Sequence, residues 1–435
     1  MRKAFLLTTL LLLVMLVAEA SAQTAPWWKP AWTRRAPITV SGGGAAFPAV
    51  PVILYGRTIE EAAGGEAVAV GSLRVVGPQG EVPCQFDECD GTGAFVSAPN
   101  HELDPDDELS FQADLPAQGE ARYYLYWSTA SMPPGRYPGT VRVHEPVEPD
   151  AFLGDIQFHN REAFVGMKGP GTGADLTKNA AENWGNGVVT FMDLYHRRLL
   201  GGGWASIFPQ GALFCSPGTE IAKWQTPRAI ARGPVRAGAS CLLPEATLSL
   251  PNDQTARVRV EHRTWLWDRG AIVFLEERFT PLDPIASLRR GYSCGWNLNP
   301  GGTDRIFYSV KGESRLYQPT AEQLQQGTGL RFNQPTDPWM VKYSPSDRFL
   351  TGALLDEGEP RAGDLREGSS YGYADVTLRH YDTLNNLAAN ETLYRRFWYL
   401  ALPGDYADGA LAHAFPQVFS SRAVSLGAAE KGGAR

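Results

Sequence analysis

The sequence lacks the short motifs that mark several common chemistries. It contains no glycine-rich phosphate loop, no dinucleotide-binding fingerprint and no Gly-x-Ser-x-Gly turn. Its cysteines form no Cys-x-x-Cys pair, and no spacing of cysteine and histidine is typical of a zinc site. The motifs therefore point to no nucleotide, to no serine nucleophile of that type, and to no particular metal or cofactor.

A surplus of positive charge is also lacking. The 40 Lys and Arg residues are outnumbered by 47 Asp and Glu residues, which gives a formal net charge of -7 at pH 7. A general nucleic-acid-binding protein needs a basic surface to meet the phosphate backbone. We therefore do not expect a nucleic acid as a partner.

Only one long apolar run is present, and it lies at the N-terminus. Residues 4–18 are mostly apolar and follow the basic Met1-Arg2-Lys3, and Ala20-Ser21-Ala22 resembles a signal-peptidase site. The run is shorter than the ~20 residues that cross a bilayer as a helix. We therefore predict a secretory signal peptide at residues 1–22, a secreted or periplasmic mature chain, and no membrane span after signal cleavage.

The cysteines suggest disulfide pairs, and an acidic stretch beside two of them is a candidate calcium site. Cys84 and Cys89 flank a short loop, which predicts a local disulfide in an exported protein, and Cys215 with Cys241 is a second candidate pair. The acidic, glycine-rich residues 87–93 offer oxygen ligands for calcium. They lack the ligand spacing of a known calcium loop, so a solvated turn is the favoured interpretation.

Long helices, heptads and fixed-period repeats are absent as well. The one helix that we predict is short, over Thr320–Gln326, with Thr320 as its N-cap. Runs rich in β-branched and aromatic residues alternate instead with Gly, Pro and Asn turns. This pattern predicts an all-β protein.

Breaker-rich stretches divide this all-β chain in two. Residues 133–139 and 145–149 are dense in Pro and Gly or in Pro and Glu. We predict an N-terminal β-sandwich module at residues 27–145 and a large antiparallel two-layer β domain at residues 152–422. The small, glycine-rich tail from Ala423 is expected to fray.

The most regular local pattern lies between Arg232 and Thr280. Residue types alternate strictly from Arg257 to Trp267, as in a strand with two different faces, and the apolar residues 271–280 return after a turn. One face of the first strand carries Val258, Val260, His262, Thr264 and Leu266. The other, which we name the Arg/Trp face, carries Arg257, Arg259, Glu261, Arg263, Trp265 and Trp267.

Two registers are open for this hairpin. A three-residue Asp268-Arg269-Gly270 loop places His262 opposite Glu276, and turn chemistry favours it. A two-residue Arg269-Gly270 turn places Arg263 opposite Glu276, and cross-strand charge pairing favours that register. In the first register the hairpin would carry part of a site, because a carboxylate can orient an imidazole. In the second it is more typical of scaffold.

The Arg/Trp face itself has two interpretations. Arginine forks suit carboxylates and tryptophan rings suit sugar rings, which favours an acidic sugar as ligand. A polar outer face with cross-strand ion pairs is normal in an antiparallel sheet, and it is the favoured interpretation.

Two stretches carry a family resemblance. Residues 32–40 together with Tyr123-Tyr124-Leu125-Tyr126-Trp127 resemble small β-sandwich modules at the N-termini of exported bacterial proteins. Leu194-Tyr195-His196, Gly201 to Ala205, Arg232 to Ala237 and the hairpin, in that order, resemble the galactose-mutarotase-like supersandwich of carbohydrate-active enzymes, which include polysaccharide lyases and uncharacterised sugar-degradation families. The α/α-toroid domain of many such lyases is missing here.

The resemblance implies an exported all-β supersandwich protein whose partner is a polysaccharide or oligosaccharide. A lyase of uronic-acid polymers needs a group that neutralises the carboxylate and a base for the α-proton. The candidate catalytic residues are Tyr195, His196, Arg198, His262, Arg263 and Glu276. The candidate saccharide-binding residues are Trp204, Trp265, Trp296, Asn297 and Arg278, with residues 292–301 expected to form a loop on the binding face.

Two functions follow as hypotheses. One is a secreted, lyase-like enzyme acting on an acidic, pectin-like or uronic-acid-containing polysaccharide. The other is a non-catalytic carbohydrate-binding or cell-envelope protein on the same fold. A groove that combines an acid–base pair with arginine and tryptophan would favour the first, and a flat tryptophan surface would favour the second.

Overall fold

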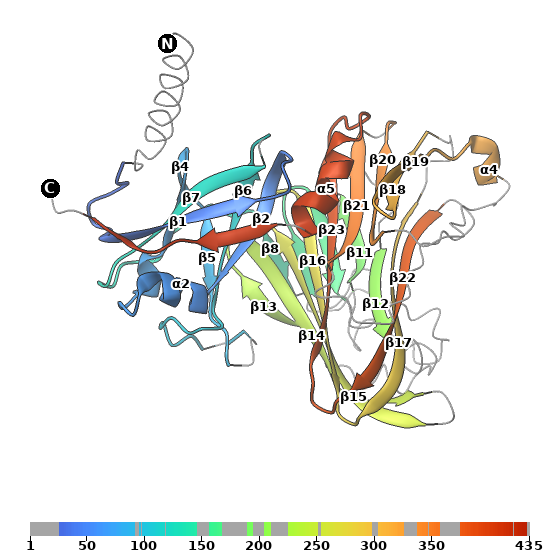
Figure 1. The fold of residues 1–435 in the computed structure, drawn as a ribbon, viewed down its shortest axis with the longest axis horizontal. Coiled ribbons are helices and arrows are strands. Elements are labelled where there is room, and N and C mark those ends of the chain that lie inside the picture. The colour runs from blue at the N-terminus through green and yellow to red at the C-terminus, as the bar shows by residue number, and fades with distance from the viewer. Residues whose placement is uncertain are drawn as a thin grey trace, which may run out of the picture.

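The described strands form five sheets (Figure 1): two are built from residues 34–127 together with 423–431, which we call the N-terminal module, and three are built from residues 142–403, which we call the larger domain. The computed structural model describes residues 26–91, 95–96, 98–117, 119–145, 156–167, 189–194, 204–209, 225–250, 254–297, 303–325, 337–346, 348–356, 375–420 and 422–432. Within these residues, antiparallel strands form several sheets and the helices are short, which confirms the predicted all-β fold class.

The N-terminal module is built from two sheets around a shared apolar core. The first has the strand order β24-β1-β7-β3-β4, with β25 also paired to β1, and the second has the order β2-β6-β5. Its elements are β1 (Arg34–Ser41), β2 (Phe47–Tyr55), α2 (Gly56–Ala63), the 3-10 turn η1 (Val70–Ser72), β3 (Arg74–Gly77), β4 (Gly80–Val82), β5 (Cys84–Asp87), β6 (Glu108–Leu115), β7 (Glu120–Trp127), β24 (Ala423–Leu426) and β25 (Glu430–Lys431).

In the larger domain, the described strands form one wide sheet and two smaller sheets. The wide sheet runs β13 (Arg228–Arg232), β14 (Arg236–Ser249), β15 (Thr255–Trp267), β16 (Ala271–Pro281), β23 (Leu393–Pro403), β21 (Phe349–Asp356), β20 (Trp339–Ser344), β18 (Arg305–Val310) and β19 (Glu313–Tyr317). The smaller sheets contain β12 (Trp204–Pro209), β17 (Ile285–Asn297) and β22 (Asp375–Leu387), and β8 (Arg142–His144), β9 (Ile156–His159), β10 (Ala163–Met167) and β11 (Val189–Leu194).

The two faces of the wide sheet are buried against different partners. Val260 and Leu266 of β15 belong to a core shared with Leu288 of β17, so this inner face packs on the smaller sheets. Trp265 and Trp267 belong to the core of the N-terminal module, so the outer face is covered by that module. From residue 262 onward the alternation of β15 therefore separates two buried faces, whereas Arg257 and Arg259 in its first half face solvent.

The predicted helix over Thr320–Gln326 is confirmed as α4 (Ala321–Gln325). The Gln323 amide donates to the Thr320 hydroxyl at 3.2 Å, and the Thr320 amide donates to Gln323 Oε1 at 2.9 Å, which is a reciprocal cap. The longer α5 (Ala410–Ser420) was not predicted, because Pro416 lies inside it. Phe419 of α5 packs against Phe47 of β2 and Trp398 of β23, so α5 joins the module to the wide sheet.

The hairpin adopts the register in which Arg263 lies opposite Glu276 and Trp265 lies opposite Phe274. The prediction that His262 lies opposite Glu276 is therefore wrong, and His262 faces Glu277 instead. The turn is held from outside the hairpin. Asn160 Nδ2 donates to the carbonyls of Trp267 and Gly270, each at 2.7 Å, and Gln112 exchanges two hydrogen bonds with the Arg269 backbone.

The C-terminal tail does not fray, contrary to the prediction. Ile38 of β1 pairs with Leu426 of β24, and Arg35 pairs with Glu430 of β25. Figure 1 shows the red C-terminal strand running alongside blue β1. Residues 423–426 and 430–431 thus complete the first sheet, which supplies the backbone partners that a free tail lacks.

The predicted Cys84–Cys89 disulfide is not formed, and both thiols are free and buried. Cys84 begins the extended strand β5, and a rise of about 3.3 Å per residue along a strand carries Cys89 beyond disulfide reach. Cys84 Sγ instead lies 3.5 Å from Tyr137 Oη. Cys215 lies outside the described residues, so its pairing with Cys241 stays a prediction.

Candidate functional site

A cleft of about 620 Å³ lies between the N-terminal module and the outer face of the wide sheet. We name it the inter-module cleft. The module contributes Ile53, Tyr55, Asp106 and Glu108 to its wall. Arg422 and Val424, which follow α5 in the sequence, also line the cleft. The wide sheet contributes most of the remaining wall, with Arg236, Arg263, Trp265, Phe274, Glu276, Arg278, Tyr394, Arg396 and Trp398.

A carboxylate held between two arginines forms the charged part of the cleft. Glu276 Oε1 accepts from Arg278 Nε at 2.8 Å, and Glu276 Oε2 accepts from Arg396 Nε at 3.1 Å. The Glu276 side chain is 7% exposed, whereas those of Arg278 and Arg396 are 18% and 41% exposed. We name these three residues the Arg–Glu–Arg triad. On the neighbouring strands, Arg278 also lies opposite Glu261 and Arg396 lies opposite Asp356.

Two tyrosines lie beside the Arg–Glu–Arg triad on opposite walls of the cleft. Tyr394 of β23 is 50% exposed, and its ring centroid lies 5.5 Å from the guanidinium of Arg278 and 5.6 Å from that of Arg396. Tyr55, at the end of β2, is 47% exposed. The surrounding protein partly removes the Tyr55 phenol from water, which raises the pKa of Tyr55, and the charge of Glu108 raises it further. Tyr55 therefore keeps its proton at neutral pH.

A row of buried aromatic rings forms the floor. The Trp265 and Phe274 ring centroids are 5.5 Å apart, and those of Phe274 and Trp398 are 4.4 Å apart, both pairs tilted. Gly238 lies opposite Trp265 on β14, where a Cβ atom would meet the indole at 2.5 Å. The backbone of β14 can therefore pass beneath the ring only because residue 238 has no side chain.

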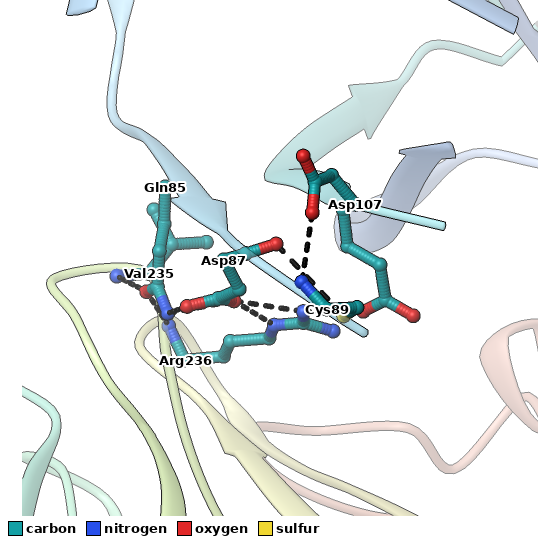
Figure 2. Close-up of polar contacts among 7 residues, drawn as sticks. Gln85, Asp87, Cys89, Asp107, Val235 and Arg236 are labelled. Atoms are coloured by element: carbon teal, nitrogen blue, oxygen red, sulfur yellow. Dashed lines mark hydrogen bonds and ion pairs between the residues drawn. The ribbon is translucent and has the colours of Figure 1, made fainter. Parts of the chain in front are cut away.

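The back of the cleft is closed by a buried ion cluster that joins the two parts of the protein (Figure 2). Arg236, 1% exposed, donates to Asp87 Oδ2 at 2.8 Å and also to Glu108 Oε2. Burial alone would lower the pKa of Arg236, but Glu108 and Asp87 raise it, so the guanidinium stays charged. Gln85 Oε1 accepts hydrogen bonds from the backbone amides of both Val235 and Arg236.

This cluster corrects the interpretation of residues 87–93 as a solvated turn. The Asp87 side chain is only 11% exposed because it pairs with Arg236, and that of Glu88 is 9% exposed. Glu88 accepts from the backbone amides of Asn100 and His101. In the part of the chain that the structure describes, no group of three or more His, Cys, Asp or Glu side chains is arranged to hold a metal ion.

The inner face of the same strands carries a second polar row. His262 Nε2 lies 3.3 Å from Glu277 Oε2, with Cys241 opposite His262 and Arg395 opposite Glu277 on the neighbouring strands. All four are at least 95% buried in the otherwise apolar core between the sheets. The condition that a carboxylate faces His262 is thus met, by Glu277 rather than by Glu276.

The predicted site residues divide among three places. Arg263, Glu276, Trp265 and Arg278 meet in the inter-module cleft, whereas His262 faces the interior on the other side of the sheet. Trp204, Trp296 and Asn297 lie on β12 and β17, in the opposite layer, so the backbone does not bring them to the cleft. Tyr195, His196 and Arg198 lie outside the described residues.

One loop prediction is wrong, and several cleft residues were not predicted. Residues 292–297, expected in a loop, belong to β17 and pair with both β12 and β22. The cleft residues missed from the sequence are Tyr55, Arg236, Tyr394, Arg396 and Arg422. Tyr394 and Arg396 share one face of β23, which is a local signal, but nothing local connects that face to Tyr55.

No described helix has the length and apolar composition needed to cross a membrane. No protein-family model matches the sequence. No curated protein matches it.

Comparison with solved structures finds matches at TM-scores below 0.5. An alpha-mannosidase from Enterococcus faecalis is 10% identical with a TM-score of 0.42, over 92% of this chain and 46% of that one. A galactose 1-epimerase from Lactobacillus acidophilus is 11% identical with a TM-score of 0.33, over 61% of this chain and 99% of that one. An alpha-N-acetylgalactosaminidase from Bifidobacterium bifidum is 12% identical with a TM-score of 0.35, over 60% and 38%. The chain thus spans about half the length of the mannosidase (46%).

Proposed function

We propose that this protein binds an acidic saccharide in the inter-module cleft. The observation that carries the proposal is the placing of Tyr55 and Tyr394 on either side of the Arg–Glu–Arg triad. Exposed aromatic rings offer flat surfaces for the apolar faces of sugars, and arginine forks donate paired hydrogen bonds to carboxylates. A ring carrying a carboxylate matches both elements of the cleft at once.

The cleft is also suited to binding by its rigidity. Its two walls are joined by Arg236 behind the floor and by the aromatic contacts of α5 with both parts. A preformed site loses little conformational entropy when a ligand binds. Binding to this cleft is therefore expected to need no reorganisation of the backbone.

Lyase activity on a uronic-acid-containing polysaccharide is the finer form of the proposal. The Arg–Glu–Arg triad provides positive charge that would neutralise a uronate carboxylate and stabilise the enolate. A base for the α-proton is not identified among the described residues of the cleft, whose lining includes no histidine, and the pKa of Tyr55 is raised. The geometry therefore supports binding more strongly than catalysis, and a non-catalytic carbohydrate-binding or cell-envelope protein is the alternative.

One experiment separates these possibilities. The protein is incubated with a panel of neutral and uronic-acid oligosaccharides, and calorimetry reports binding while ultraviolet absorbance reports an unsaturated product. We expect binding of uronate ligands that Arg396→Gln or Tyr394→Ala weakens by roughly tenfold, the loss of one charge-assisted or stacking contact. The matched control is Arg257→Gln on β15, whose exposed guanidinium pairs with Asp283 outside the cleft.

The outcomes are distinct. Binding without product leaves the carbohydrate-binding function and removes the lyase, whereas product formation supports the lyase. If no acidic saccharide binds, or if the cleft variants behave like Arg257→Gln, the proposal is wrong. Export is a separate part of it, and N-terminal sequencing of the mature protein tests cleavage after Ala22.

A further inference from the structure

A second cavity lies beside the inter-module cleft and has no part in the proposed function. Its volume is about 780 Å³, and it is bounded by η1, β5, residues 131–137 and the turn between β13 and β14. The ion pair of Asp87 with Arg236 lies between the two spaces, because Asp87 lines this cavity and Arg236 lines the cleft. We name this space the module cavity.

The wall of the module cavity is mainly apolar. Six of its apolar or aromatic side chains are only partly buried: Val70, Phe86, Phe95, Met132, Tyr137 and Ile230. Covering such a surface with an apolar ligand removes it from water, which is favourable. Concave apolar walls around a space of this size are typical of sites that bind small molecules.

The charged side chains of this wall have partners within the protein. Arg74 Nε lies 3.3 Å from Glu81 Oε1, and Asp87 belongs to the ion cluster at the back of the cleft. Glu88 accepts from two backbone amides and lies 3.6 Å from His101 Nδ1. The charges that the structure describes on this wall are thus already matched, so an ionic ligand would leave water without gaining a free partner.

A thiol and a phenol are the neutral polar groups of the wall. Cys84 Sγ lies 3.5 Å from Tyr137 Oη, and Tyr137 Oη donates to Glu81 Oε1 at 2.9 Å. Burial raises the pKa of the Cys84 thiol and of the Tyr137 phenol, so both groups keep their protons at neutral pH. Neither group adds a charge to the cavity.

The walls of the module cavity are held in place by contacts of their own. Arg74 donates to the carbonyls of Gly71 and Pro133 at 2.9 and 2.7 Å, which joins η1 to residues 131–137. A Cβ atom on Gly71 would lie 2.3 Å from the Met132 carbonyl oxygen, so these backbones meet only because residue 71 is glycine. Gln85 Oε1 accepts from two backbone amides at the beginning of β14. The cavity is therefore preformed, which favours binding.

We propose that the module cavity binds an uncharged, apolar small molecule. Such a ligand would cover the apolar wall and leave every described charge with its present partner. The site goes beyond the proposed saccharide binding and does not depend on it, because its residues and its ligand class are different.

The test uses two probes that share one ring system. N-phenyl-1-naphthylamine is uncharged, and 8-anilino-1-naphthalenesulfonate carries an added sulfonate; both fluoresce more strongly in apolar surroundings. We expect the wild-type protein to bind the uncharged probe roughly tenfold more tightly. Met132→Lys adds a cation to the wall and should shift the ratio of the two affinities by roughly tenfold toward the sulfonate.

A larger side chain at the same position tests the location. Met132→Trp should weaken binding of the uncharged probe by roughly tenfold, because the indole occupies part of the cavity. Leu316→Trp, on an exposed position of β19 outside the cavity, is the control and should change that affinity by less than about twofold. Thermal unfolding confirms that each variant is folded.

The two thiols of this region give an independent measurement in the wild-type protein. Cys84 lines the module cavity, whereas Cys89 is also free and buried but does not line it. A saturating concentration of the uncharged probe should slow alkylation of Cys84 by iodoacetamide roughly tenfold and leave the rate at Cys89 unchanged. Peptide mass spectrometry measures both rates.

The outcomes decide for or against the site. Protection of Cys84 alone, together with the expected shifts in the Met132 variants, supports it. The proposal is wrong if the uncharged probe does not bind, if Cys89 is protected as strongly as Cys84, or if Met132→Lys leaves the ratio of affinities unchanged. If Met132→Trp does not fold, the protection of Cys84 decides by itself. None of these failures bears on saccharide binding, which is measured with other ligands at the inter-module cleft.

Discussion

At the scale of single residues, Arg236 shows how the protein stabilises a charge away from water. Its guanidinium is 1% exposed and pairs with two carboxylates that come from the other part of the molecule. Removing one partner of a buried ion cluster leaves the others buried without compensation, which costs more than the cluster itself contributes. Arg236 therefore matters for the attachment of the N-terminal module as well as for the shape of the cleft.

We predict that Arg236→Met lowers the free energy of unfolding by about 3 to 5 kcal/mol, because Asp87 and Glu108 lose their cation. Urea unfolding followed by tryptophan fluorescence measures the change. The triple variant Arg236→Met, Asp87→Asn, Glu108→Gln should recover part of the loss, since it buries no unpaired charge. Arg257→Met, at an exposed pair, should change stability by less than about 0.5 kcal/mol. Equal losses in the single and triple variants would contradict this explanation.

The faces of β15 were predictable from its residues, but the carboxylate beside His262 was not. The alternation of β15 correctly placed His262 on the apolar face and Arg263 and Trp265 on the other. It did not identify the partner of His262, because two adjacent glutamates, Glu276 and Glu277, exchange faces when the register slips by one residue. The residue types were sufficient to define the faces but not to choose between the two carboxylates.

At the scale of secondary-structure elements, the turn between β15 and β16 is determined by contacts from elsewhere in the chain. Asn160 and Gln112 bind the backbone of Trp267, Arg269 and Gly270, and Gly270 adopts a φ of 75°. Local turn chemistry favoured the other register, and cross-strand pairing favoured the observed one. The register was undetermined in the sequence because residues more than a hundred positions away hold the turn.

We predict that Asn160→Ala destabilises the protein by about 1 to 3 kcal/mol, since it leaves the buried carbonyls of Trp267 and Gly270 without their amide donor. Urea unfolding gives the magnitude, and hydrogen exchange at β15 and β16 shows whether the effect begins at the hairpin. Arg259→Ala, exposed on the same strand, is the control and should change the free energy of unfolding by less than about 0.5 kcal/mol. A loss of stability with unchanged exchange in the hairpin would count against this role for Asn160.

The strands themselves were largely predictable, and the exceptions have physical reasons. Runs of β-branched and aromatic residues marked β2, β6, β7, β16 and β23 because such side chains pack well on a pleated surface. The helix α5 was not predicted because its interior proline argues against a helix. Its buried Phe415 and Phe419 are nevertheless on the side that packs against the rest of the protein. The wall of the cleft formed by β15 and β16 was predictable, because both strands belong to one hairpin. The wall that contains Tyr55 was not, because it comes from a strand distant in the sequence.

At the scale of the whole molecule, the two ends of the described chain meet in one sheet. Glu66 lies at that meeting point and pairs with Arg34 of β1 and with Lys431 of β25, the latter at 3.0 Å. Hydrogen bonds from Arg34 and then from Lys431 lower the pKa of Glu66 from 4.5 to about 2. Because the folded-state pKa lies below the ordinary value, the contribution of Glu66 is present above pH 4.5 and is lost as the pH falls toward 2.

We predict that β25 loosens over this pH window. Hydrogen-exchange protection of residues 430–431, corrected for intrinsic rates, should fall from pH 6 to pH 2 in the wild-type protein. Glu66→Gln should show the lower protection already at pH 6, so that the two proteins converge at low pH. Parallel pH profiles for the two proteins would show that Glu66 does not anchor the strand.

The pairing of Ile38 with Leu426 also limits the order in which the first sheet can form. In a chain made from its N-terminus, β1 is synthesised well before β24, so the edge of β1 that β24 covers has no partner while the residues between them are being made. Contacts between such distant residues close large loops and form slowly. The first sheet is therefore completed only after β24 has been made, and during that interval β1 presents an open edge to other chains.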